Sequence, residues 1–534
     1  MSDSQFDYVI VGAGSSGCVL ANRLSADPRV SVLLLEAGGP DTHPFIAIPK
    51  GLAKILGKPQ YAYYYPTEPF GPRNQTEYWM RGKVLGGSSS VNGMVYNRGA
   101  RADFDSIEAA GNPGWGWDEI LRVYRAMENH SLGGSDMRGE GGPLGVSVRT
   151  DTEQVDELLM ASAAGIGMRK VTDLNASDDE RIGYAAATIH HRTRMSAARA
   201  FLHPVRRRPN LTVRTGVQVN RVLFDGERAV GVEAEAEGST VSWSARREVL
   251  LSAGSIATPQ LLELSGIGAR DVLKDAGVEV LVDSPRIGEN VREHRCFPLQ
   301  VRLGKNIGYN RLLSSVPAQA LSGARWLLTG RGPIGTPAYD MLGFVKTREG
   351  LDRPDAQMLL TPYSMGIGAA GIGVENRPGF SLLGFALRPT SEGSIHIRSK
   401  DPRIPPRIVP NYLSTAHDRD TSLAVFRRMR ALVEQSPIAD LVTAEIMPGT
   451  VVEDDEAIIN SGYLYGGTGY HSCGSVAMGP QDESPVDPRL RVRGVSGLRV
   501  VDASVMPSMV SGNLNAPAMA MAWRAAELIR EDND

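Results

Sequence analysis

Three glycines near the start of the chain carry the first chemical signal in the sequence. Gly12, Gly14 and Gly17 have the spacing GxGxxG and directly follow an apolar run at residues 8–11. In a strand–turn–helix unit, such glycines permit a tight turn, the approach of a pyrophosphate to the backbone, and close packing of helix on strand. A second apolar run at residues 30–35 ends in Glu36, whose carboxylate can accept hydrogen bonds from a ribose diol. Together these residues predict a dinucleotide-binding βαβ unit, with the pyrophosphate on free N–H groups at the helix N-terminus.

A second group of reactive side chains lies near the other end of the chain. His471 and Cys473 stand two residues apart, and Asn513 and Asn515 follow downstream. A lone histidine is more often a core or surface residue than a catalyst, but imidazole can accept and return a proton near neutral pH. A Cys–His nucleophile is the less favoured alternative, because side chains two apart on an extended segment need not touch and no third orienting group is evident. Cys473 is expected to pack as a small apolar residue.

The elements expected to position these residues alternate between strands and helices. The first unit is predicted to be a strand at 8–11, a helix at 15–24 and a strand at 30–35. Further predicted elements are a helix at 115–128, two strands within 211–224, a strand at 248–253, a helix at 259–264, a helix at 418–435, a strand at 498–501 and a final helix at 518–529. This alternation predicts an α/β fold in which ligands bind where buried strands end and helices begin.

A glycine–serine segment separates the first unit from the rest of the chain. Gly86 and Gly87 are followed by Ser88 and two further serines, within the stretch RGKVLGGSSSVNGMVYNRGARADFD at residues 81–105. Unhindered backbone N–H groups and short hydroxyls suit an anion or the polar edge of a flat ring. An ordinary surface loop would not explain the apolar residues that continue through the segment.

Length and composition limit the remaining possibilities. The 534 residues exceed the size at which one core keeps growing, so two or more substructures are expected. A net charge of -3 gives no basic field, so nucleic acid is not an expected partner. No apolar run is long enough for a membrane span, and the N-terminus has no signal-peptide pattern. Three cysteines show neither a disulfide framework nor zinc-ligand spacing, so a cytoplasmic protein without a bound metal is expected.

Several of these motifs resemble the glucose–methanol–choline (GMC) flavin oxidoreductases. Residues 82–105 match the first signature of that family, and GSIATPQLLELSGIG at residues 254–268 matches the second. The stretches YHSCG and GNLNAP near the C-terminus extend the resemblance to essentially the whole chain. The resemblance implies FAD as cofactor. It also implies an α/β, Rossmann-like FAD-binding domain and a discontinuous substrate domain built on an antiparallel sheet with helices, so that the whole chain is α+β.

The resemblance also implies roles for individual residues. His471 matches the base that takes the hydroxyl proton beside the flavin, and Asn513, eleven residues before Arg524, matches its partner. Asn515 is the alternative to Asn513, and either asparagine could instead be a turn or N-cap residue. Cofactor contacts are implied at Gly12, Gly14, Ser15, Ser16, Gly17, Glu36, Ala37, Arg81, Val84, Gly86, Gly87, Ser88, Asn92, Gly93, Met94, Val95, Val219, Ala253, Gly254, Asp502, Ala503, Asn515 and Pro517.

The family's domain plan implies two discontinuous domains in this chain. The FAD-binding domain is expected to comprise residues 1–153, 206–300 and 467–534, and the substrate domain residues 154–205 and 301–466. Apolar and aromatic residues that could line a substrate pocket, although most are expected in the core, are Phe344, Tyr363, Met365, Tyr463 and Tyr465.

The expected reaction is the oxidation of an uncharged primary alcohol, aliphatic or aromatic, to the aldehyde. Some family members attach FAD through a histidine where this chain has Val91, so a non-covalent flavin is expected. The expected electron acceptor is molecular oxygen or another compound, since the sequence does not separate an oxidase from a dehydrogenase. The sequence is also compatible with a homo-oligomer. The alternatives are a hydroxynitrile lyase-type protein with non-redox FAD and choline dehydrogenase-like activity. A nicotinamide enzyme is disfavoured, because no second nucleotide motif is visible.

Overall fold

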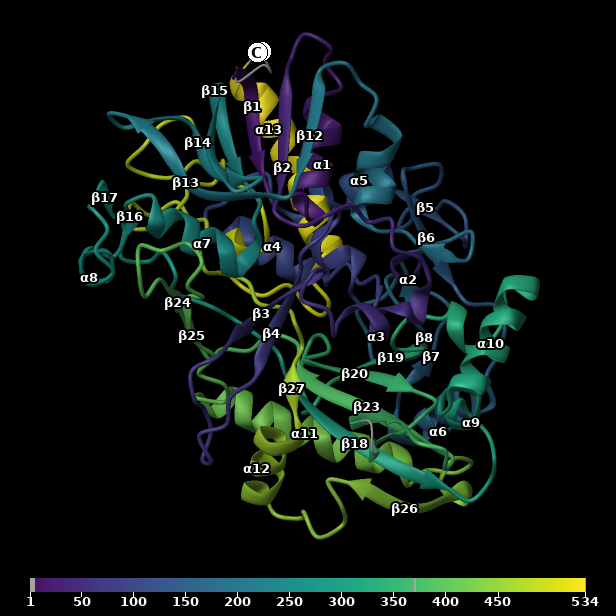
Figure 1. Cartoon of the computed structure of the whole chain (residues 1–534). Helices are drawn as coiled ribbons and strands as arrows, with labels where there is room; N and C mark the ends of the chain where they lie inside the picture. Colours follow the sequence, from purple (N-terminus) through teal and green to yellow (C-terminus); the bar gives the residue numbers. More distant parts are fainter. Residues whose placement is uncertain (1–4, 369–370, 534) are drawn as a thin grey trace.

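The computed structural model describes residues 5–368 and 371–533, which form two regions, each built on one large sheet (Figure 1). The first sheet has seven strands in the order β12-β2-β1-β15-β14-β13, with β28 paired to β15. Its strands are β1 (Gln5–Val11), β2 (Val32–Glu36), β12 (Leu211–Thr215), β13 (Val217–Asp225), β14 (Arg228–Ala236), β15 (Ser239–Leu251) and β28 (Leu498–Val500). The pairs β1–β2, β2–β12, β1–β15 and β15–β28 are parallel, whereas β13, β14 and β15 form an antiparallel meander. The predicted Rossmann-like sheet is confirmed.

The two ends of the chain lie side by side in this region. Helix α1 (Ser15–Leu24) has the predicted bounds, and it packs against α13 (Asn515–Asn533), drawn in yellow beside it in Figure 1. β2 is buried at every position, as expected for a parallel strand covered on both faces. The hydroxyls of Ser15 and Ser16 donate to the Asn515 side chain and to the Ala518 carbonyl, respectively, so the first and last segments form one unit.

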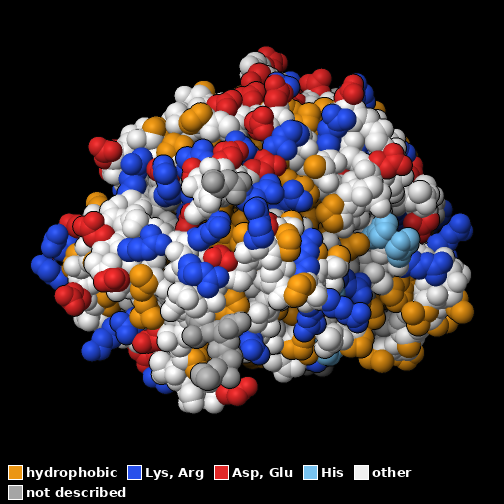
Figure 2. Space-filling model, turned by 90° about the horizontal axis from the view of Figure 1, so that it is seen from above, with side chains coloured by type: hydrophobic (Ala, Val, Ile, Leu, Met, Phe, Trp, Pro, Cys, Tyr) orange, Lys and Arg blue, Asp and Glu red, His pale blue; other side chains and the backbone are white. Residues whose placement is uncertain are grey.

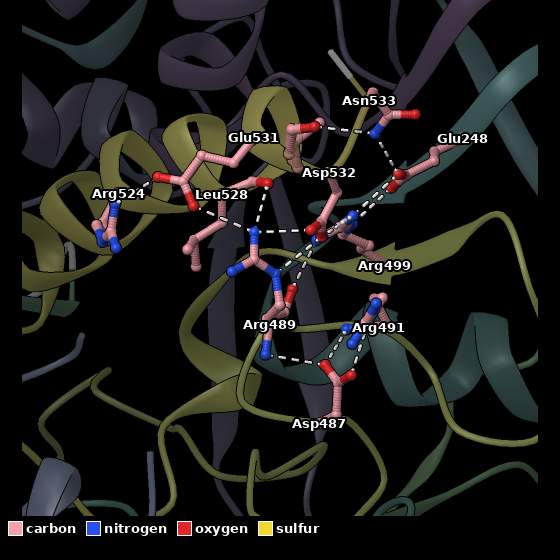
Figure 3. A network of polar contacts seen from close by, with 11 residues as sticks. Glu248, Asp487, Arg489, Arg491, Arg499, Arg524, Leu528, Glu531, Asp532 and Asn533 are labelled. Atoms are coloured by element: carbon pink, nitrogen blue, oxygen red, sulfur yellow. Dashed lines mark hydrogen bonds and ion pairs between the residues drawn. The ribbon is translucent and has the colours of Figure 1, made fainter. Parts of the chain in front are cut away.

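An ionic network around the buried Arg499 and Glu248 fixes the far end of α13 (Figure 3). Arg499 on β28 donates to Glu248 on β15 at 2.6 and 3.0 Å and to Asp532 at 2.8 Å. Arg489 also reaches Asp532, and Asn533 donates to Glu248 at 2.8 Å. Arg499 is 2% exposed, so loss of its partners would leave a buried charge unpaired. The network therefore holds α13 against the edge of the sheet.

The second region contains an eight-stranded sheet of order β26-β18-β23-β20-β19-β8-β7, with β27 paired to β18. Its strands are β7 (Arg169–Lys170), β8 (Arg181–Tyr184), β18 (Arg295–Leu303), β19 (Met341–Val345), β20 (Ala356–Thr361), β23 (Gly379–Ala386), β26 (Val442–Met447) and β27 (Gly467–Thr468). Its pairs are antiparallel except for β7–β8. α11 (Ala416–Val433) packs on this sheet and agrees closely with the helix predicted at 418–435. The boundary expected at residue 300 falls inside β18.

Shorter elements connect and cover the two sheets. The helices among them include α2 (Pro44–Ala47), η1 (Pro49–Gly51), α3 (Leu52–Ile55), η2 (Gly87–Ser90), α4 (Arg101–Ala109), α5 (Trp117–Met127), α6 (Gln154–Ala163), α8 (Arg270–Asp275), α9 (Asn310–Leu313) and η6 (Pro333–Gly335). Small strands outside the two sheets include β3 (Ala62–Pro66), β4 (Tyr78–Gly82), β5 (Glu128–His130), β6 (Leu144–Val148) and β9 (Ala186–Ala187). Among the described residues, no helix is long and apolar enough to cross a bilayer. Acidic and basic side chains are interspersed over the face seen in Figure 2.

Some predicted element bounds are wrong. Helix α7 (Gly254–Leu264) begins five residues before the predicted start at Pro259, which lies inside it. Proline has no N–H to bond the Ser255 carbonyl, and the hydroxyl of Ser475 donates to that carbonyl at 2.7 Å instead. The span expected to contain strands and one helix also holds α10 (Val316–Thr329) and α12 (Asp455–Tyr465).

Candidate active site

A cavity of about 850 Å³ runs between the two regions and has residues from both sheets in its wall. The glycine turn at Gly12 and Gly14 and the carboxylate of Glu36 lie along it, as do His471 and Asn513. Most of the residues implied by the resemblance also line it. Those that do not are Gly17, Val84, Gly86 and Pro517. The cavity thus brings together residues that are hundreds of positions apart in the sequence.

The glycine turn leaves backbone N–H groups directed at one end of the cavity. Gly14 is the N-cap of α1, and no side chain caps the helix. A Cβ on Gly12 would lie 2.5 Å from the Ser252 carbonyl oxygen, and one on Gly17 would lie 1.8 Å from the Gly12 carbonyl oxygen. Gly12 also has a positive φ of 99°. The uncapped first turn is a site for an anion, and the glycines are required for the backbones to approach this closely.

Glu36 is buried at the end of β2, beside the glycine turn. Its two carboxylate oxygens accept from the backbone N–H groups of Ala13 at 2.9 Å and Gly38 at 2.8 Å. Burial raises the pKa of Glu36 to about 7. Each oxygen keeps a further lone pair, so the carboxylate can still accept from hydroxyl groups in the cavity.

The glycine–serine segment forms the wall opposite α1. A Cβ on Gly87 would lie 2.7 Å from the Cα of Gly14, so two glycine turns meet at this point. The guanidinium of Arg194 donates to the backbone oxygens of Ser89 and Asn92 at 3.2 and 2.8 Å and so holds the segment in place. Burial lowers the pKa of Arg194 to about 9. Nothing in the pattern around Arg194 had suggested this structural role.

His471 lies at the other end of the cavity, in a loop tied to the second sheet. β27 pairs with the start of β18, which places the histidine next to Glu293 and His294. The Glu293 carboxylate accepts from the backbone N–H groups of His471 at 2.8 Å and His294 at 2.9 Å. The preceding residue, Tyr470, has a φ of 61°, a conformation that non-glycine residues rarely adopt and that is concentrated at functional sites.

A directional chain of hydrogen bonds determines the protonation of His471. His294 Nε2 lies 3.0 Å from the Leu387 carbonyl oxygen, which can only accept, so this nitrogen carries the hydrogen. Burial lowers the pKa of His294 to about 4, so its Nδ1 is an unprotonated acceptor. The Nδ1 of His471 lies 2.9 Å from it and must therefore donate. The Nε2 of His471 is then the nitrogen without a hydrogen and can only accept.

The asparagine beside His471 completes the same chain. Asn513 Nδ2 lies 2.9 Å from His471 Nε2, while Asn513 Oδ1 accepts from Gln357 Nε2 at 3.3 Å. His471 Nε2 carries no hydrogen and can only accept, so the Asn513 amide presents its N–H group to it, with its oxygen toward Gln357. Burial, with smaller contributions from His294 and Arg81, holds the pKa of His471 well below its usual range. His471 is consequently uncharged at neutral pH.

The structure separates the remaining catalytic alternatives in space. Asn515 accepts from the Ser15 hydroxyl at 2.7 Å, so it lies at the start of α1, whereas Asn513 contacts His471. Cys473 is fully buried in the core, and burial raises the pKa of its thiol. A thiol that stays protonated is a poor nucleophile.

The expected pocket residues are only partly brought together. Tyr465 lines the cavity, but Phe344, Tyr363, Met365 and Tyr463 do not. Phe344 lies in the core of the second sheet and Tyr463 packs near Phe70. The sequence reasoning missed other wall residues near the histidine end, namely Cys296, Tyr339, Leu359, Leu383 and Tyr470. Alternation along β20 and β23 could have suggested Leu359 and Leu383, because one face of the sheet meets the cavity.

Comparison with known proteins places the chain in a family. Models of the GMC oxidoreductases match residues 6–296 and 389–522. The chain belongs to the GMC oxidoreductase family. It is 37% identical over 528 residues to an alcohol dehydrogenase [acceptor] of Pseudomonas putida, covering 98% of this chain and 95% of that protein. It is also 37% identical over 532 residues to an oxygen-dependent choline dehydrogenase of Photobacterium profundum, covering 99% and 93%.

Solved structures of other GMC proteins share the whole fold. Pyridoxine 4-oxidase from Mesorbium loti has a TM-score of 0.89 at 29% identity, covering 99% of each chain. A fungal aryl-alcohol oxidase has a TM-score of 0.84 at 25% identity, covering 99% of this chain and 100% of the other. These comparisons confirm the predicted family, fold and FAD-dependent oxidation of an alcohol. The cavity fits FAD, since it offers an uncapped helix N-terminus and a buried carboxylate at one end and a base at the other.

Proposed function

We propose that this GMC enzyme oxidises an uncharged, apolar primary alcohol to the aldehyde, with His471 as general base and Asn513 as its hydrogen-bonding partner. The directional chain through His294, His471 and Asn513 is the observation that carries the assignment. Bound FAD, held without a covalent bond because Val91 has no nucleophilic side chain, supplies the hydride acceptor.

The arrangement of His471 and Asn513 suits the deprotonation of a hydroxyl. An alcohol oxygen that replaces the direct Asn513–His471 hydrogen bond would donate its proton to His471 Nε2 and accept a hydrogen bond from Asn513 Nδ2. The donated hydrogen bond stabilises the negative charge that develops on oxygen as the proton leaves. Imidazole then holds the proton while the adjacent carbon loses hydride.

His294 acts through His471 and is a positioning residue. It keeps the hydrogen of His471 on Nδ1, so that Nε2 is always the unprotonated nitrogen. Glu293 holds the backbone of both histidines, which fixes the separation of the two rings. The proton acceptor is therefore preorganised before an alcohol binds.

The wall of the cavity near His471 favours an apolar substrate. Leu359, Leu383 and Cys296 come from the second sheet, and Tyr339 and Tyr470 add aromatic surface. Among the described residues of the wall, the carboxylates are Glu36 and Asp502. Both are occupied by backbone N–H groups of the FAD-binding region, Asp502 by that of Gly254 at 2.8 Å. A cationic alcohol such as choline would find no carboxylate among these wall residues at the histidine end.

The type of turnover, the electron acceptor and the location of the protein are further parts of the proposal. The names of the similar proteins are those of dehydrogenases and oxidases, which favours redox turnover over a lyase. Molecular oxygen or another small acceptor would take the electrons. The three cysteines are free and buried, which supports a reducing, cytoplasmic location.

Anaerobic titration of the purified yellow protein tests this function. We expect aliphatic and benzylic primary alcohols to bleach the flavin, choline to do so much more weakly, and cyanohydrins to be left uncleaved. Acid precipitation should leave the yellow colour in the supernatant. Bleaching by choline but by no neutral alcohol would overturn the substrate class, and an unbleached flavin with cleavage of cyanohydrins would favour a lyase.

A further inference from the structure

Helix α10 carries its apolar side chains on the face that points away from the protein. Val316, Leu321, Leu327 and Leu328 expose 74%, 72%, 69% and 83% of their surface. Pro317, Ala320 and Ala324 are exposed between them. These positions recur at spacings of three and four, so they share one side of the helix. The buried residues of α10, Ser322 and Trp326, lie on the other side.

This orientation is the reverse of that in an ordinary surface helix, which buries its apolar face against the core. Figure 1 places α10 at the outer edge of the second region, and Figure 2 shows hydrophobic side chains gathered along that edge. A contiguous exposed apolar surface of this kind marks a site of interaction.

The charge of the surrounding segment indicates what the helix meets. Residues 305–331 include Lys305, Arg311, Arg325 and Arg331 but no aspartate or glutamate. All four basic side chains belong to exposed residues. Within residues 305–331, the apolar face of α10 is flanked by basic side chains and by no acidic ones. Such a face complements a surface that has anionic groups on the outside and an apolar layer below them.

We propose that α10 docks the protein on an anionic phospholipid surface. The helix would lie in the plane of the interface, with Leu321, Leu327 and Leu328 among the acyl chains and the basic residues on the phosphates. This interaction goes beyond the proposed oxidation of an alcohol and does not depend on it.

A second copy of the chain fits this face less well than a membrane does. A 14-residue helix is about 21 Å long, so one of its faces alone offers less accessible surface than the roughly 800 Å² that each partner buries in a stable protein interface. Two copies packed face to face would also bring arginines together with no carboxylate from residues 305–331 between them.

The position of α10 gives docking a consequence for the substrate. The helix packs on η6, and η6 packs on η1. Leu52 and Leu56, which follow η1, and Ala338 and Tyr339, which follow η6, line the cavity. A docked helix would therefore place cavity-lining segments near the bilayer, where apolar alcohols concentrate.

Vesicle co-sedimentation of the FAD-loaded full chain tests the proposal. We expect binding to vesicles of phosphatidylglycerol and phosphatidylcholine, weak binding to phosphatidylcholine alone, and loss of binding in high salt. The double variant Leu327→Ser, Leu328→Ser should lower vesicle affinity at least tenfold, and Arg311→Ser with Arg325→Ser should do so for anionic vesicles only. Val451→Ser is the matched control, because Val451 is 89% exposed at a distance from α10 in the sequence and should not matter.

The outcomes distinguish docking from other roles of the helix. Flavin absorbance and reduction by alcohol in solution should stay unchanged in all these variants, which shows that they fold and that activity is separate. Absence of binding by the wild type, or equal binding by the leucine variant and the Val451 control, would overturn the proposal. A wild-type dimer in size-exclusion chromatography that becomes a monomer only in the leucine variant would instead assign this face to a second copy.

Discussion

The two ends of the cavity are built in different ways. At the nucleotide end, backbone N–H groups and one carboxylate come from a continuous stretch, Gly12 to Glu36. At the histidine end, the hydrogen-bond chain joins His294, Gln357, His471 and Asn513, each from a different segment. The first end is thus suited to binding, which needs fixed donors and acceptors, and the second to proton transfer, which needs one particular tautomer.

This comparison predicts that substitutions at one end change rate and those at the other change affinity. A variant that affected both quantities equally would show that the two ends are not independent. The most informative measurements are therefore flavin reduction by rapid mixing under anaerobic conditions and FAD dissociation, made on the same proteins.

The largest effect is expected for His471→Ala. Loss of the general base should slow flavin reduction by about 10²–10⁴-fold, while FAD stays bound because its nucleotide end is unchanged. Cys473→Ala is the matched control two residues away, and it should reduce its flavin nearly normally. If the cysteine variant failed and the His471 variant did not, the catalytic assignment would be wrong.

The next largest effect is expected for Asn513→Ala. Removal of one positioned donor should slow reduction by about 10²–10³-fold. The effect should not add to that of His471→Ala, because both groups act on one hydroxyl in one step. Asn515→Ala provides the comparison: it should weaken FAD binding through the contact with Ser15 and leave the reduction of loaded enzyme nearly unchanged.

A smaller effect is expected for His294→Leu. Without an acceptor for its Nδ1–H, His471 can adopt the other tautomer, and reduction should slow by roughly 10–100-fold. His294→Gln offers an amide oxygen to the same hydrogen and should restore part of the rate. Equal loss in both variants would point to a merely structural role for His294.

At the nucleotide end, Glu36→Ala should weaken FAD binding by about 1.5–3 kcal/mol through loss of a charge-assisted acceptor. Reduction of the FAD-loaded variant should proceed at close to the wild-type rate. Since Glu36 also accepts from Ala13 and Gly38, the melting temperature of the FAD-free form serves as the control for a loosened turn. Unchanged FAD affinity would contradict the ribose assignment.

The smallest effect is expected from pH. His471 must be unprotonated to accept a proton, and its lowered pKa keeps it so at neutral pH and below. The rate of reduction should therefore stay level as the pH falls through about 6.5, the ordinary pKa of histidine, and decline only in more acid solution. Burial also raises the pKa of Glu293, which accepts from the His471 backbone N–H group, to about 7. A break at or above about 6.5 that persists in Glu293→Gln would therefore show that burial does not depress the pKa of His471 in the working enzyme.

The difference between the two ends also explains what could be read from the sequence. Gly12, Gly14, Gly17 and Glu36 are recognisable because local spacing alone creates their geometry, and α1 has the predicted bounds. His294 and Gln357 carry no such spacing, since they reach His471 only through the pairing of β18 with β27 and of β19, β20 and β23. Asn513 was found through resemblance to a family, and the hydrogen-bond chain in which it lies needed the tertiary structure.

The bounds of some helices were predicted wrongly because local sequence does not show contacts between distant segments. Pro259 suggested a helix start by its local preference, but Ser475, more than two hundred residues later, accommodates it inside α7. Helix α10 was not predicted, because Pro317 and Gly323 interrupt its run of helix-forming residues in the sequence.

The pairing of α1 with α13 has a consequence for the order in which the protein is made. Residues 5–36 leave the ribosome long before residues 498–533, yet the sheet they begin gains β28 and the covering helix α13 only when the later residues have emerged. During that interval the hydroxyls of Ser15 and Ser16 lack their acceptors on Asn515 and Ala518. A nascent chain would thus hold an incomplete nucleotide site until residues 498–533 have been made, and flavin incorporation would follow that point.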